Sequence, residues 1–219
     1  IKSENDEPEQ ANITFNGGSF NISAVDDGVS TTGDLTVNNA DINITVCEEG
    51  LEGKTVLIEK GNINIVANDD GINAHGIEVS EERYEGADLT INGGNINIDV
   101  HGDGVDSNGD LSFNGGQIFI SGAAGGGNTS IDFDLNSKLG DATVIATGFS
   151  GMCRGFKTTP NPTVTVYLEA AVSDAITLSD ASGNIIISFA PTKEYNHIFI
   201  SSPSIKLENS YTLKYGEAV

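Results

Sequence analysis

The chain has 219 residues, of which 37% are hydrophobic and 27 are glycine, so it can build one extended domain with an apolar core. Its 32 acidic residues outnumber 10 basic ones, and the formal net charge of −22 repels nucleic-acid phosphates and anionic lipids. No run approaches the about 20 apolar residues of a membrane-spanning helix. We therefore expect no nucleic-acid partner and no membrane span.

The two cysteines and three histidines are scattered along the chain: Cys47, Cys153, His75, His101 and His197. They are too few and too far apart in sequence to predict a disulfide framework, a zinc site or a catalytic triad. Any bound metal is therefore expected to have oxygen ligands.

Residues 1–12 are rich in Glu, Asn, Asp and Pro, and this composition predicts an N-terminal tether. A ten-residue pattern then repeats through residues 13–159. Its copies begin at Ile13, Leu35, Val56, Leu89 and Leu111, in steps of 22, 21, 33 and 22 residues. The long step contains an insertion, residues 78–88, which we expect to leave the regular coil as an excursion.

Each copy consists of two short stretches of alternating apolar residues around a turn, which predicts strand, turn and strand. Units this short cannot close a core alone, but stacked coils would align their like residues. The sequence thus predicts a parallel β-helix of six to seven coils, roughly 30 Å long at the strand spacing of about 4.8 Å. The expected inward column is Phe20, Ile42, Ile63, Ile96 and Ile118, and the expected outward amide ladder is Asn21, Asn43, Asn64 and Asn97.

The repeat stops at a proline-containing breaker, residues 158–162. Short alternating segments follow and predict an antiparallel β cap over residues 160–219. Such a cap would cover the end of the solenoid, where unpaired strand edges otherwise invite aggregation. Residues 180–183 and 207–210 are expected to be hairpin turns within it.

Acidic residues recur at one position of the repeat. They occur in Asp26-Asp27-Gly28, Glu48-Glu49-Gly50, Asp69-Asp70-Gly71 and Gly102-Asp103-Gly104. A second polar column follows two residues after each glycine and comprises Ser30, Glu52, Asn73 and Asp106. Carboxylates stacked about 4.8 Å apart repel one another unless a cation bridges them. Ca²⁺ meets this need because it takes six to eight oxygen ligands, and we expect carbonyls of the glycine turns to complete its coordination.

Three interpretations of the acidic columns stay open. The acids could keep a rod soluble and block lateral association of its sheets. Calcium could serve only as a structural staple between coils. Alternatively, calcium could also meet a ligand through an open coordination position.

The acidic turns resemble those of bacterial carbohydrate-binding β-helix proteins, which are related in fold to pectate lyases. The matching segments are Asp26-Asp27-Gly28, Glu49-Gly50-Leu51-Glu52-Gly53, Asp69-Asp70-Gly71-Ile72-Asn73 and Gly102-Asp103-Gly104-Val105-Asp106-Ser107-Asn108-Gly109. The resemblance covers residues 13–215. It implies an all-β, right-handed parallel β-helix that contains calcium and binds cellulose and acidic sugars. In the first coil, Val29-Ser30 departs from the family pattern, which weakens that coil as a site.

The same resemblance implies a ligand set for more than one calcium ion. Its first choices are Asp27, Glu49, Glu52, Asp70, Asn73, Asp103 and Asp106, and its second choices are Asp26, Glu48 and Asp69. Alternation along the chain suggests that adjacent acids point in different directions.

Carbohydrate contacts are expected at two places. Arg83 could grip a uronate while Tyr84 packs on the sugar face; the alternative is an ordinary surface loop in which Arg83 pairs with Glu81 or Glu82. The chain has no Trp, so cellulose binding would depend on Asn43, Asn64 and Asn97 more than on stacking.

The expected function is non-catalytic, calcium-dependent binding of polygalacturonate and cellulose by a secreted or cell-surface protein. Calcium would let a polyanionic protein hold a polyanionic sugar, and millimolar calcium and plant-wall polymers both occur outside cells. Pectate lyase is the first alternative, but a base embedded in the acidic columns is not recognisable in the sequence. A hydrolase with two carboxylates and a calcium-stapled structural or adhesive protein are the others.

Overall fold

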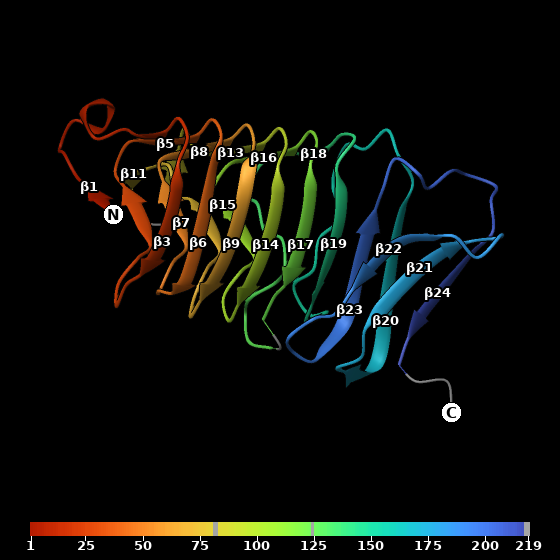
Figure 1. Cartoon of the computed structure of the whole chain (residues 1–219). Helices are drawn as coiled ribbons and strands as arrows, with labels where there is room; N and C mark the ends of the chain where they lie inside the picture. The colour runs from red at the N-terminus through yellow and green to blue at the C-terminus, as the bar shows by residue number, and fades with distance from the viewer. Residues whose placement is uncertain (81–82, 124, 217–219) are drawn as a thin grey trace.

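The computed structural model describes residues 1–80, 83–123 and 125–216. It confirms an all-β parallel solenoid followed by antiparallel strands (Figure 1). The described helical structure is one 3₁₀ turn, η1 (Pro8–Gln10), and none of the described residues form a helix with the length and hydropathy of a membrane span.

Three sheets of parallel strands make the walls of the solenoid. Sheet A consists of β1 (Lys2–Ser3), β4 (Val29–Thr31), β7 (Leu51–Gly53), β10 (Ile72–Ala74) and β15 (Val105–Ser107). Sheet B consists of β2 (Ile13–Phe15), β5 (Asp34–Val37), β8 (Thr55–Ile58), β13 (Asp88–Ile91), β16 (Asp110–Phe113) and β18 (Ser137–Leu139). The parallel part of sheet C consists of β3 (Ser19–Ser23), β6 (Ala40–Val46), β9 (Gly61–Ala67), β14 (Asn95–Val100), β17 (Gln117–Ser121) and β19 (Thr143–Gly148).

The predicted register is confirmed coil by coil. Ile42, Ile63, Ile96 and Ile118 are fully buried and pair in sequence along sheet C, with half-buried Phe20 at the start of the column. The residues that open β4, β7, β10 and β15 of sheet A, such as Leu51 and Ile72, are equally buried. The alternation of apolar and polar residues therefore positions the outward side chains, which form the candidate sites.

The glycine of each acidic turn lets neighbouring coils approach closely. A Cβ on Gly50 would lie 2.3 Å from the carbonyl oxygen of Gly71, and a Cβ on Gly71 would lie 2.5 Å from that of Gly104. Only glycine avoids these overlaps, because real Cβ atoms do not come so near to a carbonyl oxygen. The repeated glycine thus fixes the spacing of the acids that precede it.

The N-terminal segment is not the free tether that its composition predicts. β1 pairs with β4, the terminal ammonium donates to the carbonyl of Gly28 at 2.7 Å, and Ala11 is buried. Strand β4 otherwise lies at the open edge of sheet A, and an edge strand binds any extended segment that can satisfy its backbone groups. Residues 1–12 therefore extend sheet A by one strand.

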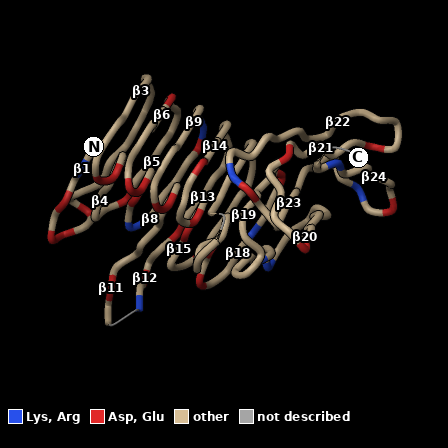
Figure 2. The backbone as a smooth tube through the Cα atoms, turned by 90° about the horizontal axis from the view of Figure 1, so that it is seen from below, with Lys and Arg blue, Asp and Glu red and all other residues tan. Residues whose placement is uncertain are grey.

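The insertion after β10 forms the predicted excursion. β11 (Ile77–Ser80) and β12 (Arg83–Glu85) pair as an antiparallel hairpin. It projects from the solenoid on the side where acidic residues recur (Figure 2). β13 nevertheless keeps its register with β8, so the coil closes behind the hairpin.

The antiparallel cap is confirmed, and it divides between two sheets. β20 (Thr163–Val172) and β23 (Tyr195–Ser201) continue sheet C, with β23 antiparallel to β19. β21 (Ile176–Asp180), β22 (Ile185–Phe189) and β24 (Tyr211–Tyr215) form a separate sheet. Residues 180–183 form the predicted hairpin turn, but residues 207–210 do not, because β23 and β24 belong to different sheets.

Candidate functional site: an acidic face with a carboxylate cluster

The outward side of sheet A, with the turns that precede its strands, is the acidic face of the molecule. Two rows run along it from coil to coil, as the acidic segments in Figure 2 indicate. The turn row contains Asp27, Glu49, Asp70 and Asp103, and the strand row contains Ser30, Glu52, Asn73 and Asp106 in register. The β-helix therefore aligns all seven first-choice calcium ligands on one face.

Adjacent acids point in different directions, as alternation predicts. In the third coil Asp70 is half-buried and Asp69 is exposed, and in the second coil Glu49 is half-buried and Glu48 is exposed. Asp26 is also exposed and lies 3.8 Å from the ammonium of Lys2. The three second-choice residues thus lie outside the acidic rows and face solvent.

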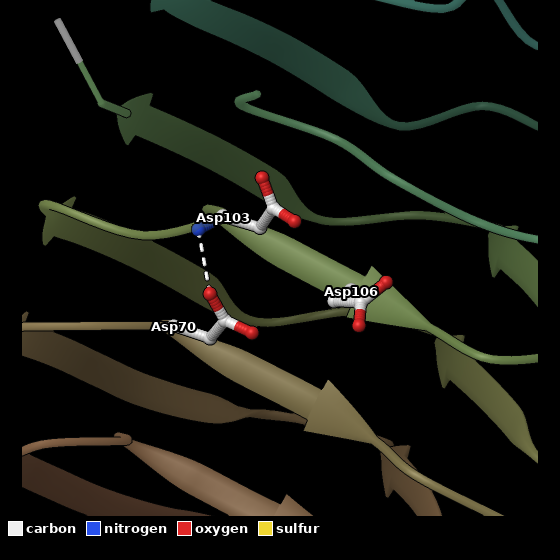
Figure 3. Close-up of side chains that lie close together, drawn as sticks. All are labelled: Asp70, Asp103 and Asp106. Atoms are coloured by element: carbon white, nitrogen blue, oxygen red, sulfur yellow. Dashed lines mark hydrogen bonds between the residues drawn. The ribbon is translucent and has the colours of Figure 1, made fainter. Parts of the chain in front are cut away.

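Three of the predicted ligands form a tight carboxylate cluster. Asp70, Asp103 and Asp106 each offer an oxygen, and these atoms all lie within 4.8 Å of one another (Figure 3). Asp70 and Asp103 come from successive turns and Asp106 from β15. We call these three residues the aspartate cluster.

Burial and mutual repulsion make the cluster costly to ionise. Burial, followed by neighbouring carboxylates, raises the pKa of Asp103 and of Asp106 to about 7, and it raises the pKa of Asp70 to about 6. Such a cluster favours a bound cation, because a positive charge removes the repulsion among the carboxylates.

One oxygen of each turn aspartate is already engaged by the next coil. Asp70 Oδ1 accepts the backbone N–H of Asp103 at 2.6 Å, and Asp103 Oδ1 accepts that of Thr129. These bonds hold the carboxylates in a fixed orientation. The other oxygen of each group is available to a ligand.

Asn73 contributes a buried acceptor beside the cluster. Its amide donates to Glu49 Oε2 at 3.0 Å, and it is in register with Asp106. Its Oδ1 is buried and accepts no hydrogen bond from the described residues. A buried carbonyl-type oxygen without a donor is costly unless something else, such as a cation, meets it.

These residues fit a calcium ion. Bonds of about 2.3–2.6 Å place two oxygens on opposite sides of Ca²⁺ about 4.6–5.2 Å apart, and the cluster's oxygens span up to 4.8 Å. The donors are carboxylates with one amide oxygen nearby, which is the oxygen chemistry that Ca²⁺ prefers.

We expected carbonyls of the glycine turns to complete the coordination of calcium, but the glycine carbonyls do not face the cluster. The carbonyls of Gly50, Gly71 and Gly104 accept the N–H groups of Val29, Leu51 and Ile72, respectively. They therefore point along the stack into the hydrogen bonds of sheet A. The observed role of these three carbonyls is therefore hydrogen bonding between coils.

The other first-choice ligands lie on the same face in a looser arrangement. In the described chain, Asp27, Glu49 and Glu52 do not meet the spacing that the aspartate cluster meets. Burial and Glu52 together raise the pKa of Glu49 to about 8 and also raise that of Asp27. Glu52 accepts a hydrogen bond from Ser30 Oγ at 2.6 Å.

Two functional candidates were missed from the sequence. Val105 pairs with Ile131, which places Asp132 next to Asp106 in the strand row, and Asp132 contributes to the raised pKa of all three cluster residues. The guanidinium of Arg154 lies 3.2 Å from Asp132 Oδ1. A basic residue therefore adjoins the acidic rows, although none could be recognised there from the sequence. Asp132 lies 26 residues after Asp106 rather than 22, so the period of the repeat alone does not identify it.

Arg83 and Tyr84, which were predicted to contact a sugar together, have different surroundings in the hairpin. Arg83 is exposed and forms an ion pair with Glu85; the alternative partners Glu81 and Glu82 lie outside the described residues. Tyr84 lines a groove of about 570 Å³ between the N-terminal segment, the acidic face and the hairpin. The residues that line this groove include Asp27, Ser30, Glu52 and His75.

The asparagine column is a partial amide ladder on sheet C, away from the acidic face. Asn43 donates to Asn21 at 3.2 Å, and Asn97 donates to Asn64 at 2.9 Å. These bonds support the predicted structural role, and they leave further amide groups facing outward.

The described chain is thus a parallel β-helix with an acidic flank and a three-carboxylate cluster. Residues 1–82 match a protein family described as carbohydrate-binding domain-containing protein. This match, which covers the first three coils, supports a sugar-binding role. No curated protein and no solved structure matched the chain.

Proposed function

We propose that the protein is a non-catalytic, calcium-dependent binder of acidic cell-wall polysaccharide such as polygalacturonate, with cellulose as a second polymer, and that it acts outside the cell or on its surface. The observation that carries the proposal is the aspartate cluster, whose oxygens lie within 4.8 Å of one another on a face of aligned acids. The family match at residues 1–82 supports the sugar as the ligand class.

In this proposal Asp70, Asp103 and Asp106 hold a calcium ion, with Asn73 Oδ1 as a further donor. Calcium supplies positive charge and open coordination positions that accept uronate carboxylate or hydroxyl oxygens in place of water. Backbone N–H groups of the next coil orient the carboxylates of Asp70 and Asp103, which would fix the ion's position. Asp27, Glu49 and Glu52 are the candidates for a second ion.

The groove beside the first coils would seat the sugar chain. The Tyr84 ring lines one side, and its side chain is 37% exposed. Aromatic rings pack on the apolar faces of sugar rings, while polar groups of the groove bond the hydroxyls. A polyuronate lying along the acidic face would then meet bridging calcium and Tyr84 together.

Pectate lyase is the second candidate, and Arg154 is the observation that favours it. A lyase needs a base that removes the proton alpha to a uronate carboxylate. The Arg154 guanidinium adjoins the acidic rows but is paired with Asp132 at 3.2 Å and also donates to the carbonyl of Phe133 at 2.6 Å. These contacts favour a structural role for Arg154 and hence the binding function.

The test is a pull-down on insoluble polygalacturonate and on cellulose, in calcium and in EGTA, with the supernatant read for unsaturated uronides. We expect retention on polygalacturonate in calcium only, without product. Tyr84→Ala should weaken retention, whereas Tyr215→Ala, at a ring of similar exposure in the cap (39%), should not.

Three other results would contradict the proposal. Unsaturated product would identify a lyase, and Arg154→Ala should then abolish product formation. Calcium-dependent thermal stabilisation without retention on either polymer would identify a structural rod. Equal retention in calcium and in EGTA would show that sugar binding does not depend on calcium.

A further inference from the structure

A second concave site lies on sheet C, where the cap meets the solenoid. It is a cleft of about 230 Å³ whose floor is the outward face of β9, β14 and β17 and whose wall is the segment between β22 and β23. We call it the cap cleft. Its lining includes Asn64, Val66, Asn97, Phe119, Phe189 and Thr192.

Two contacts fix the cap wall on the solenoid. Lys193 forms an ion pair with Asp99 of β14, and Thr192 bonds Ser121 Oγ of β17 through both its N–H (3.1 Å) and its hydroxyl (2.9 Å). The wall is therefore held in place before any ligand arrives, which lowers the ordering cost of binding.

The cleft has an aromatic side. The register of sheet C continues the asparagine column directly into Phe119, so Asn97 and Phe119 are neighbours on adjacent strands. The Phe119 ring stacks on Phe189 of the cap, with centroids 5.8 Å apart and planes inclined by 25°. Both rings are half-buried, so part of their apolar surface faces the cleft.

The opposite side of the cleft offers uncharged donors and acceptors. Each asparagine amide can make up to four hydrogen bonds, and the bond from Asn97 to Asn64 uses one position of each. The remaining N–H and C=O groups face solvent beside Val66, whose side chain is 45% exposed. Sugar hydroxyls, which both donate and accept, match such groups.

The charges of the cleft select a neutral occupant. Asp99 is the ionisable residue among its lining residues, and Lys193 neutralises it. The protein's net charge of −22 disfavours an anionic chain where no cation bridges it. The volume of the cleft is below the about 300–1,000 Å³ of pockets for drug-sized ligands, so it suits about one sugar ring.

We propose that the cap cleft is a calcium-independent binding site for a neutral saccharide, in which Phe119 and Phe189 contact the apolar face of the ring and Asn64 and Asn97 bond its hydroxyls. The inference rests on the proposed sugar-binding function but assigns neutral sugars to a different sheet from the acidic face. A chain that leaves the cleft can continue over the amides of Asn43 and Asn21.

The test titrates cellohexaose into the whole protein in EDTA and follows binding by calorimetry and by amide and methyl NMR shifts. We expect shifts at Val66 and at the Asn97 side-chain amide. Val66→Asp, which puts a charge into the cleft from an exposed position, should weaken binding at least tenfold. The matched control is Val46→Asp in the neighbouring coil, because Val46 is 43% exposed and does not line the cleft.

Absence of cellohexaose binding, equal losses in both valine variants, or binding that requires calcium would overturn the inference. The proposed function is read separately, by calcium-dependent retention of the same variants on polygalacturonate. If the wild type binds cellohexaose but is not retained on polygalacturonate in calcium, the acidic-face proposal is contradicted and the cap cleft stands.

Discussion

Replacing Asp106 with asparagine should have opposite effects on stability with and without calcium. The substitution keeps the shape of the side chain and removes one charge of the aspartate cluster. Two unit charges at 4.8 Å, the upper limit for the separation of the cluster's ligand oxygens, repel by about 3.5 kcal/mol at an effective dielectric constant of about 20. Asp106 has two such neighbours, Asp70 and Asp103.

The stability gained by removing this charge will be smaller than the combined repulsion from both neighbours, because carboxyls with raised pKa values are partly protonated near neutral pH. We expect Asp106→Asn to stabilise the calcium-free protein at pH 8 by about 1–3 kcal/mol, the scale of a single Coulomb pair. For a chain of this size, 1 kcal/mol corresponds to about 2–4 °C in Tm. The variant should therefore melt about 2–12 °C above the wild type in EDTA.

In calcium, the wild type should be more stable than Asp106→Asn. A ligand at 100 times its Kd stabilises the folded state by about 2.7 kcal/mol, and the variant lacks one carboxylate donor for it. We expect calcium to raise the wild-type Tm well above its value in EDTA and to raise that of Asp106→Asn much less.

The assay is thermal unfolding followed by far-ultraviolet circular dichroism in EDTA and in millimolar calcium. Glu169→Gln is the charge-matched control, because it removes one exposed acid of β20 and should change stability by no more than about 0.5 kcal/mol. Destabilisation by Asp106→Asn in EDTA would refute the repulsion argument. Equal calcium responses in wild type and variant would refute Asp106 as a ligand.

Three further predictions concern the scaffold. Ile96→Ala, at a fully buried position, should cost about 2–5 kcal/mol in urea unfolding, while Ile77→Ala, at a 45% exposed position, should cost less than about 0.5 kcal/mol; similar losses would place Ile96 outside a well-packed core. Gly71→Ala brings a Cβ within 2.5 Å of the Gly104 carbonyl oxygen and of Ile98 and should lower stability by about 1–3 kcal/mol, a loss that an unchanged Tm would disprove. Burial lowers the pKa of His197 from 6.5 to about 4, so between these values the unfolded chain binds a proton that the folded chain does not. The stability of the wild type relative to His197→Gln should therefore fall by up to about 3 kcal/mol as the pH drops from 6.5 to 4, and parallel pH profiles in urea unfolding would contradict this.

The repeat made most of the solenoid predictable. Like residues of successive coils, such as Ile63 and Ile96, must pair once the coils stack, so register, core column and acidic rows all follow from the period. The composition of residues 1–12 predicted a tether, but polar residues do not prevent an extended segment from pairing with the edge of β4.

Contacts between distant segments were beyond sequence reasoning. Phe119 and Phe189 are 70 positions apart and meet only because the cap folds back beside β17. Asp132 follows an irregular coil without the acid-acid-glycine turn, and Arg154 approaches it from beyond β19. Periodicity relates residues within the repeat, but it carries no information about partners supplied by the cap or by the loops.

The hairpin β11–β12 shows how such a solenoid can acquire new recognition elements. The coil that contains it is eleven to twelve residues longer than its neighbours, yet β13 pairs with β8 and with β16 in unbroken register. The junction after β10 therefore tolerates added length without strain on the core. Changes in the length or tip sequence of this hairpin could reshape the Tyr84 groove while the aspartate cluster and the stacked isoleucines stay unchanged, so specificity and stability can evolve independently.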